Sequence, residues 1–218
     1  MHSKLFPMNT THYLLILDRS GSMSDCWDST MSALNEQIQS IKNIQANSPN
    51  VPIKVNFLTF NNEVQFEFLS VPAAHLEPLN NQRLFPSGCT AMLDGIGQGI
   101  QRIKHIMKQE DDVVCVILTD GEENASKEFG YKQIGGMIEE LKATGKWSFI
   151  LMGADFDIFD MADKLNIDAN KQVRFQKNQT KEMFQEIDHM MNHYIAAKGT
   201  GKLTDVFKFD KKNNKPKK

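Results

Sequence analysis

A buried-strand pattern that runs into a loop of small polar residues decides the fold: Tyr13–Ser22 reads YLLILDRSGS. Its first five residues form a continuous apolar run, which is typical of a strand covered on both faces. Asp18, Ser20 and Ser22 follow at once, and Gly21 permits a sharp turn between the serines. Because helical spacing begins at Trp27, we expect a βα unit with an oxygen-rich loop at the carboxyl end of its strand.

Strand and helix patterns alternate along the rest of the chain. Helices are predicted over 27–44 (ending before Pro49), 93–107, 131–144, 157–165 and 183–194, and strands over 13–17, 53–60, 64–69, 113–118, 147–153 and 173–175. Asn61 and Asn62 predict a hairpin turn between the second and third strands, because Asn tolerates positive φ. We therefore expect an α/β fold: a doubly wound, Rossmann-like, mostly parallel sheet with one antiparallel edge strand and helices on both faces.

The overall composition restricts the class of protein. A chain of 218 residues and 24.8 kDa, 40% hydrophobic and 24% charged, fits one globular domain and excludes a wholly disordered chain. No run approaches the roughly 20 apolar residues of a membrane helix, and Met1–Thr10 lacks the apolar segment of a secretory signal, so we expect a cytoplasmic protein. Cys26, Cys89 and Cys115 are odd in number and far apart, which argues against a disulfide framework or a structural zinc site.

Charge is distributed unevenly along the chain. The net charge is −2, but Lys202–Lys218 holds seven lysines against Asp205 and Asp210, a local charge of +5 that leaves −7 on the rest. We expect a domain over 1–198 and a basic, disordered tail over 199–218 that folding does not need. Only Phe207 and Phe209 suggest that part of the tail docks. A basic tail can attract nucleic acid, but the acidic remainder argues against that partner.

Two more predicted strand ends or loops carry oxygen side chains. The strand over 113–118 runs into Thr119-Asp120-Gly121, and Ser87-Gly88-Cys89-Thr90 precedes the helix that begins near Leu93. Because the carboxyl ends of parallel strands meet at one sheet edge, we expect five side chains to converge there: Asp18, Ser20, Ser22, Thr90 and Asp120. They offer only oxygen ligands, which favours octahedral Mg²⁺, with Mn²⁺ as the other possible ion.

This arrangement resembles the von Willebrand factor type A (vWA) domain and its metal-ion-dependent adhesion site, whose pattern is D-x-S-x-S, a distant Thr and a distant Asp. The segments ILDRSGSM (16–23), SGCTAMLDGIG (87–97) and VILTDGEEN (116–124) read like that family, and the resemblance spans roughly Thr11–Ala197. The segment FILMGADFD (149–157) is similar to stand-alone intracellular vWA proteins of bacteria and phages.

The resemblance also implies roles for the five residues. Ser20 and Ser22 would contact the metal directly, Asp18 and Asp120 would bind it directly or through water, and Thr90 would exchange in and out of contact. One coordination position would stay open for an Asp or Glu of a protein partner. Few anionic ligands leave the ion electrophilic, so an incoming carboxylate is attracted to it.

We weigh three functions. The first is a non-enzymatic, Mg²⁺-dependent protein-binding module, whose partner and oligomeric state the sequence does not identify. The alternative is a metal-dependent, phosphatase-like hydrolase that uses the same site, although an aspartyl-phosphate phosphatase would need D-x-D and Ser20 stands at its second position. The third is nucleic-acid binding by the lysine-rich tail. We expect Asp18→Ala to abolish partner binding without unfolding the domain, because a side chain on the open rim leaves no core cavity when it is removed.

Other polar residues have two interpretations each. Glu122 and Glu123 would either add negative charge beside the metal or stabilise a helix start. Asp94 would either support the metal loops or cap its helix. We interpret the three aspartates after the fifth strand as helix caps rather than a second cation site: Asp155, Asp157 and Asp160. We interpret two histidines one helical turn apart, His189 and His193, as part of a solvated helix face rather than as zinc ligands.

Overall fold

The computed structural model describes residues 8–80, 83–154 and 158–200. Asp155, Asp157 and the tail segment with Phe207 and Phe209 lie outside the described residues. The expectations placed on them therefore stay predictions, as does the domain boundary after residue 198.

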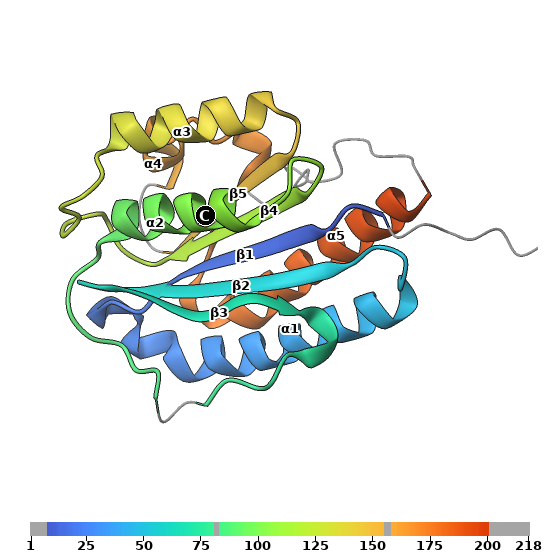
Figure 1. Cartoon of the computed structure of the whole chain (residues 1–218). Coiled ribbons are helices and arrows are strands. Elements are labelled where there is room, and N and C mark those ends of the chain that lie inside the picture. The colour runs from blue at the N-terminus through green and yellow to red at the C-terminus, as the bar shows by residue number, and fades with distance from the viewer. Residues whose placement is uncertain (1–7, 81–82, 155–157, 201–218) are drawn as a thin grey trace, which may run out of the picture.

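Each predicted strand and helix is present, in the predicted order (Figure 1). The strands are β1 (Thr11–Asp18), β2 (Ile53–Phe60), β3 (Val64–Pro72), β4 (Asp112–Thr119), β5 (Trp147–Ala154) and β6 (Gln172–Phe175). The helices are α1 (Trp27–Asn47), α2 (Met92–Ile106), α3 (Tyr131–Ala143), α4 (Ile158–Lys164) and α5 (Thr180–Gly199). Short 3₁₀ turns include η1 (Gly21–Cys26), directly before α1, and η4 (Lys177–Gln179), directly before α5.

The sheet has the strand order β3-β2-β1-β4-β5-β6. β3 pairs antiparallel with β2 at one edge, and every other neighbouring pair is parallel. The chain thus builds outward from β1 to β3 and then returns to build outward from β4 on the other side. This confirms the doubly wound α/β class, and it makes the boundary between β1 and β4 the point where strand order reverses, which is where ligands bind in such sheets.

Helices cover both faces of the sheet, α1 and α5 on one and α2, α3 and α4 on the other (Figure 1). Alternate residues of β1 enter the two cores: Tyr13, Leu15 and Leu17 pack on the α1–α5 side, and Leu14 and Ile16 on the α2–α3–α4 side. A central strand between two helical layers needs apolar residues at every position, which explains the uninterrupted run in the sequence.

α2 lies unusually close to the sheet. A Cβ atom placed on Gly99 would lie 2.9 Å from Leu58 Cδ2 and 3.3 Å from Ile16 Cδ1, so a larger residue would push the helix away. Gly99 costs some helix propensity but permits this close packing. The start of α2, and with it the preceding Thr90, is held at the carboxyl edge of the sheet by the Ala91 N–H, which donates to Asn61 O at 2.8 Å.

The hairpin between β2 and β3 is confirmed, but the predicted reason for its turn is wrong. Among the described non-glycine residues, positive φ occurs at Ser70 and Asn166, not at Asn61 or Asn62. Instead, the backbone and the side chain of Asn61 close the turn together: its N–H donates to Glu63 O at 3.0 Å, and its Oδ1 accepts a hydrogen bond from the Glu63 N–H at 3.0 Å. A short amide side chain can support a turn in this way.

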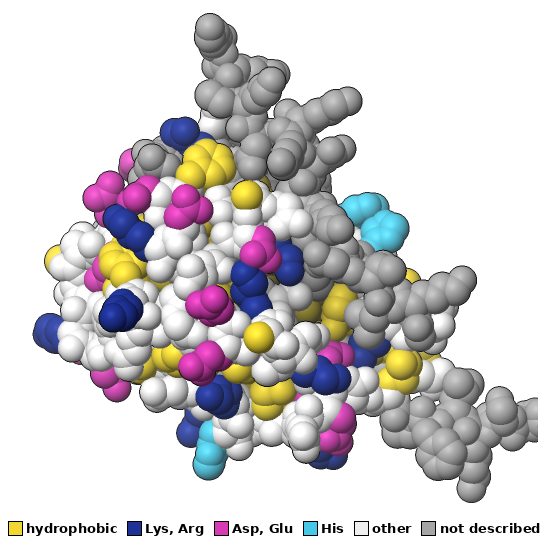
Figure 2. All heavy atoms as spheres, turned by 90° about the horizontal axis from the view of Figure 1, so that it is seen from above, with side chains coloured by type: hydrophobic (Ala, Val, Ile, Leu, Met, Phe, Trp, Pro, Cys, Tyr) yellow, Lys and Arg dark blue, Asp and Glu magenta, His cyan; other side chains and the backbone are white. Residues whose placement is uncertain are grey.

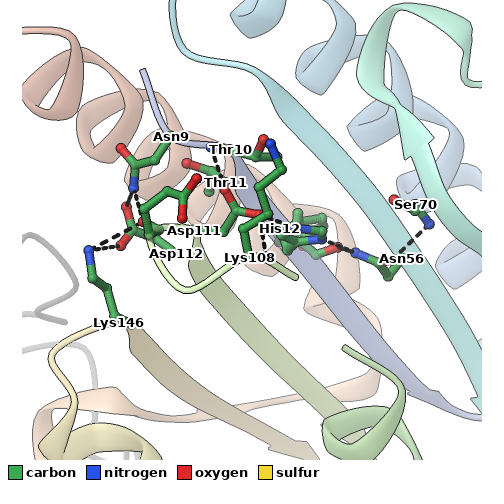
Figure 3. Close-up of polar contacts among 12 residues, drawn as sticks. Asn9, Thr10, Thr11, His12, Asn56, Ser70, Lys108, Asp111, Asp112 and Lys146 are labelled. Atoms are coloured by element: carbon green, nitrogen blue, oxygen red, sulfur yellow. Dashed lines mark hydrogen bonds and ion pairs between the residues drawn. The ribbon is translucent and has the colours of Figure 1, made fainter. Parts of the chain in front are cut away.

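A buried polar network closes the opposite edge of the sheet, where β1 and β4 begin. Lys198 of α5 is fully buried, with its Nζ 2.7 Å from Asp112 Oδ2 and donating to Thr11 Oγ1 at 2.8 Å. Figure 3 shows Asp111 beside His12, whose Nε2 lies 3.4 Å from Asp111 Oδ2. Burial holds the pKa of His12 below its ordinary value. The network fastens the end of α5 to the two central strands.

The carboxyl group of Asp188, on α5, becomes largely buried when the chain folds. We therefore expect the stability of the protein to depend on pH. Its Oδ1 is buried with no hydrogen-bond partner, and burial raises its pKa to about 7. Between about pH 4 and pH 7 the folded state then binds more protons than the unfolded chain, so stability falls as pH rises through that window. We expect Asp188→Asn to raise the melting temperature at pH 8, by roughly 2–4 °C per kcal/mol gained, and much less at pH 4.

Thermal unfolding followed by circular dichroism at both pH values measures this difference. The exposed Glu182, on the same helix, gives a matched control, since Glu182→Gln removes one charge without relieving a buried carboxylate. An equal gain at both pH values, or an equal gain from the control, would contradict the prediction.

Candidate metal site

The D-x-S-x-S loop after β1 is clamped by backbone hydrogen bonds to two neighbouring segments. Arg19 N–H donates to Phe60 O at the end of β2 (2.8 Å), and Gly21 N–H donates to Gly88 O in the loop before α2 (3.0 Å). In the other direction, Ser87 N–H donates a hydrogen bond to Arg19 O at 2.9 Å. Gly88 has φ +77°, a left-handed conformation that glycine adopts without strain. The loop is therefore shaped by the end of β2 and by the loop before α2, and not by its own sequence alone.

Asp18 lies beneath this loop and is fully buried. Its Oδ1 accepts the Ser20 N–H at 2.7 Å, and its Oδ2 accepts the Thr119 hydroxyl at 2.6 Å. The expectation that Asp18 points to an open rim is wrong, because the first residues of the loop and Thr119 at the end of β4 cover it. Burial raises the pKa of Asp18 to about 6, although these hydrogen bonds oppose the shift.

A continuous chain of oxygen contacts leads from Asp18 to the surface. Ser20 Oγ lies 3.0 Å from Ser22 Oγ, and Ser22 Oγ donates to Asp120 Oδ1 at 2.6 Å. A Cβ atom placed on Gly121 would lie 3.4 Å from Ser22 Oγ and 3.5 Å from Thr90 Oγ1, so both hydroxyls border Gly121. The structure thus brings all five residues of the predicted site to one edge, at the left in Figure 1, where α1 and α2 begin.

Two residues that sequence reasoning missed complete the cluster. Thr119 links Asp18 to the loop after β4, since its hydroxyl also lies 3.1 Å from Gly121 O. Lys177 reaches in from η4, with its Nζ 2.8 Å from Asp120 Oδ2 and donating to Ser22 O at 2.9 Å. Thr119 stands next to Asp120 in the sequence and could have been inferred, whereas nothing local marks Lys177.

The two acidic residues that follow Asp120 differ in their surroundings. Glu123 accepts hydrogen bonds from the N–H groups of Leu93, Ala125 and Ser126, between 2.7 and 2.9 Å, so it caps the start of α2. Glu122 is exposed. Of the two interpretations of this pair, helix stabilisation applies to Glu123, although the helix is α2 and not the one that follows it in the chain.

Asp94 holds the same loop from the other side. Its carboxylate accepts the N–H groups of Lys127, Glu128 and Phe129 at 2.9 to 3.0 Å, while its own N–H donates to Ser126 Oγ. Asp94 therefore neither caps its own helix nor touches the five motif residues through these bonds. It ties the segment after β4 to α2.

The other cation candidates do not assemble in the described part of the chain. Asp160 pairs with Lys164 one helical turn away, at 2.6 Å. His189 and His193 are exposed, with their rings 4.4 Å apart, as expected for a solvated helix face. No three His, Cys, Asp or Glu side chains among the described residues come together at a possible metal site. Any ion at the β1–β4 edge must therefore rely on hydroxyl ligands as well.

The donors present fit Mg²⁺ or Mn²⁺. Neighbouring ligands of an octahedral Mg²⁺ lie roughly 3 Å apart, given metal–oxygen distances of about 2.1 Å, and Ser20 Oγ and Ser22 Oγ are separated by 3.0 Å. Asp120 Oδ2 is a buried carboxylate oxygen whose charged neighbour is the Lys177 ammonium, 2.8 Å away. An oxygen-only set with a buried carboxylate oxygen that already faces a cation suits a hard metal ion.

Comparison with known proteins identifies the fold but no relative by sequence. No protein-family model matches the chain, and no curated protein matches its sequence. Solved structures do match. The vWF domain of the type V pili tip protein Mfa5 from Porphyromonas gingivalis is 10% identical with a TM-score of 0.64, over 86% of this chain and 97% of that one.

Two other solved structures are larger than this chain. Proximal thread matrix protein 1 from the mussel byssus is 11% identical with a TM-score of 0.60, over 86% of this chain and 47% of that one, and it has also been solved with a zinc-occupied metal-ion-dependent adhesion site motif. The pilus adhesin SpaC from Lactobacillus rhamnosus GG is 12% identical with a TM-score of 0.62, over 85% and 30%. The chain spans about half or less of these two proteins. At such identities the matches show the fold alone, which is the vWA fold.

Proposed function

We propose that this chain is a non-enzymatic protein-binding module whose site holds Mg²⁺, or Mn²⁺, and recognises an Asp or Glu of a partner protein. The observation that carries the proposal is the convergence of Asp18, Ser20, Ser22, Thr90 and Asp120 at the β1–β4 switch point of a vWA fold. The bound ion would supply the positive charge that attracts a partner carboxylate. The solved vWA structure with a zinc-occupied adhesion motif supports the choice of a divalent ion.

The residues of this chain would contribute to metal binding in different ways. Ser20, Ser22 and Asp120 offer the oxygens nearest one another and hold the cation, with the Thr90 hydroxyl beside them. Asp18 adds negative charge from below and orients Ser20 through its N–H. Thr119 positions Asp18 without contacting the ion. Two carboxylates only balance the two charges of a divalent ion, and with neutral hydroxyls as its other ligands the ion stays a Lewis acid that a third carboxylate, from the partner, can coordinate.

An exposed aromatic side chain lies in the loop that borders the site. Phe85, in the loop that precedes α2, is 62% exposed, and Ser87 of the same loop donates its N–H to Arg19 O. Aromatic residues are enriched at protein interfaces. This side chain favours an acidic protein segment with an apolar neighbour as the ligand.

Neither alternative function gains support from a particular contact. Glu123 and Asp94, two carboxylates close in sequence to the motif, are engaged with backbone N–H groups, so neither is free to act as a general base. On the face shown in Figure 2, the coloured Lys and Arg side chains are interspersed with Asp and Glu, so this face lacks the continuous basic surface that nucleic acid would need.

A cytoplasmic, intracellular setting completes the proposal. Cys26, Cys89 and Cys115 are all free, and Cys89 is exposed, which suits a reducing compartment. None of the helices in the described ranges is long and apolar enough to cross a bilayer. Fractionation of the cells that make the protein tests the setting.

Calorimetric titration of the full chain with MgCl₂ and MnCl₂ tests the proposed function. We expect one ion bound per chain, no heat in the presence of a chelator, and capture of a protein partner on the immobilised chain only when the divalent ion is present. Absence of binding with both ions would overturn the metal site. Capture that survives the chelator would move partner binding to another surface.

A further inference from the structure

A positively charged side chain of the protein itself, that of Lys177, lies at the candidate metal site. Lys177 Nζ lies 2.8 Å from Asp120 Oδ2 and donates to Ser22 O at 2.9 Å. The Asp120 side chain is fully buried and that of Lys177 is 24% exposed, so the ion pair joins a buried carboxylate to a partly exposed lysine.

The geometry points to an internal competitor: we propose that the Lys177 ammonium occupies Asp120 Oδ2 and must leave before a divalent ion can bind there. This inference rests on the proposed function. An ion bound to Asp120 Oδ2 would lie about 2.1 Å from that oxygen, in the sector that the ammonium already fills at 2.8 Å. Two cations at such a separation repel strongly in a partly buried site, where water screens them less than in bulk solvent.

The position of Lys177 in the fold makes the contact persistent. Lys177 opens η4, directly after the edge strand β6, and its carbonyl accepts the Thr180 hydroxyl at 2.8 Å at the start of α5. Gln179 N–H closes the same turn on Gln176 O at 2.7 Å. With its backbone fixed, the side chain has only to extend across η1 to reach Asp120. The competing charge is therefore present at high local concentration whether or not metal is available.

The consequence is a site tuned to weak affinity for divalent ions in the absence of a partner. Displacing the lysine costs the ion pair with Asp120, and this cost is subtracted from the binding free energy of the metal. A partner carboxylate that approached the ion would add attraction that the free domain lacks. Binding of metal and of partner would then be coupled more tightly than at a site without the lysine.

The test compares Lys177→Met with Lys181→Met by calorimetric titration of MgCl₂ into the full chain. Lys181 lies one helical turn further on, pairs with Glu36 at 2.9 Å and is exposed, so its removal changes net charge equally without touching the site. We expect Lys177→Met to bind Mg²⁺ at least tenfold more tightly than the unsubstituted protein, and Lys181→Met to bind as the unsubstituted protein does.

Thermal unfolding gives a second readout that does not depend on a partner. Without metal, Lys177→Met should unfold at a lower temperature than Lys181→Met, because the buried Asp120 carboxylate loses its counter-charge. MgCl₂ should then raise the melting temperature of Lys177→Met more than that of the unsubstituted protein. Equal Mg²⁺ affinities in the unsubstituted protein and both variants would overturn the competition and leave the metal site standing. Absence of Mg²⁺ binding by all three would overturn the metal site itself, and the competition with it.

Discussion

Lys198→Met is expected to lower the free energy of unfolding by about 3–5 kcal/mol, the usual cost of removing one partner from a buried ion pair. At this chain length each kcal/mol shifts the melting temperature by roughly 2–4 °C, so a loss of about 10 °C is expected. The reason is that Asp112 Oδ2 keeps its charge in a site where Lys198 Nζ at 2.7 Å was its nearest cation. Lys146 Nζ lies 3.4 Å from Asp112 Oδ1, but its side chain is 41% exposed. It therefore offsets only part of the lost attraction between Asp112 and Lys198.

Truncation supplies the control for this variant. A chain that ends after Thr200 keeps Lys198 and lacks the basic tail, and we expect its melting temperature to match that of the full chain. Guanidinium unfolding curves of the unsubstituted full chain, the truncated chain and Lys198→Met measure the differences in the free energy of unfolding. The double variant Lys198→Met with Asp112→Asn should recover part of the loss. A truncated chain as unstable as Lys198→Met would show instead that the tail docks on the domain.

Asp18→Asn is expected to weaken Mg²⁺ binding by a hundredfold or more, enough to remove it from a calorimetric titration. The substitution deletes one of the two motif carboxylates, and a divalent ion held by so few charges should dissociate readily. Asn is preferred to Ala because Asp18 is fully buried and accepts bonds from Ser20 N–H and Thr119. An amide of the same shape keeps the Ser20 contact and leaves no cavity.

The substitution Asp18→Asn should raise the stability of the metal-free domain, although it lowers the affinity for Mg²⁺. Burial raises the pKa of Asp18 to about 6, so its charge is unfavourable at neutral pH in the metal-free domain, and Asn removes that cost. Asp25→Asn, in the exposed part of η1, removes the same charge nearby and serves as the control for both measurements. Unchanged Mg²⁺ affinity in Asp18→Asn, or an equal loss in Asp25→Asn, would contradict a direct role for Asp18.

The order of the elements and the convergence of the five motif residues could be predicted from the sequence, because both depend on local signals. The apolar run Tyr13–Leu17 requires a strand with a helical layer on each face. Once β1 and β4 are neighbours, the residues that end them must meet, and so Asp18 and Asp120 share an edge. Helix spacing likewise placed α2, and with it Thr90, directly after the loop that borders the site.

Burial and charge pairing were decided only by the tertiary structure. Asp18 was expected on an open rim, but Thr119 and the following loop cover it. Nothing in the local sequence marks Lys177 or Lys198, yet one lies against Asp120 and the other is fully buried against Asp112. Periodicity reports which face a residue occupies within its own element, whereas the partner of a charge depends on how distant elements are packed. Local sequence patterns therefore predict which side chains converge at the β1–β4 edge, whereas the packing of β6 and α5 against the sheet decides which charges those side chains meet.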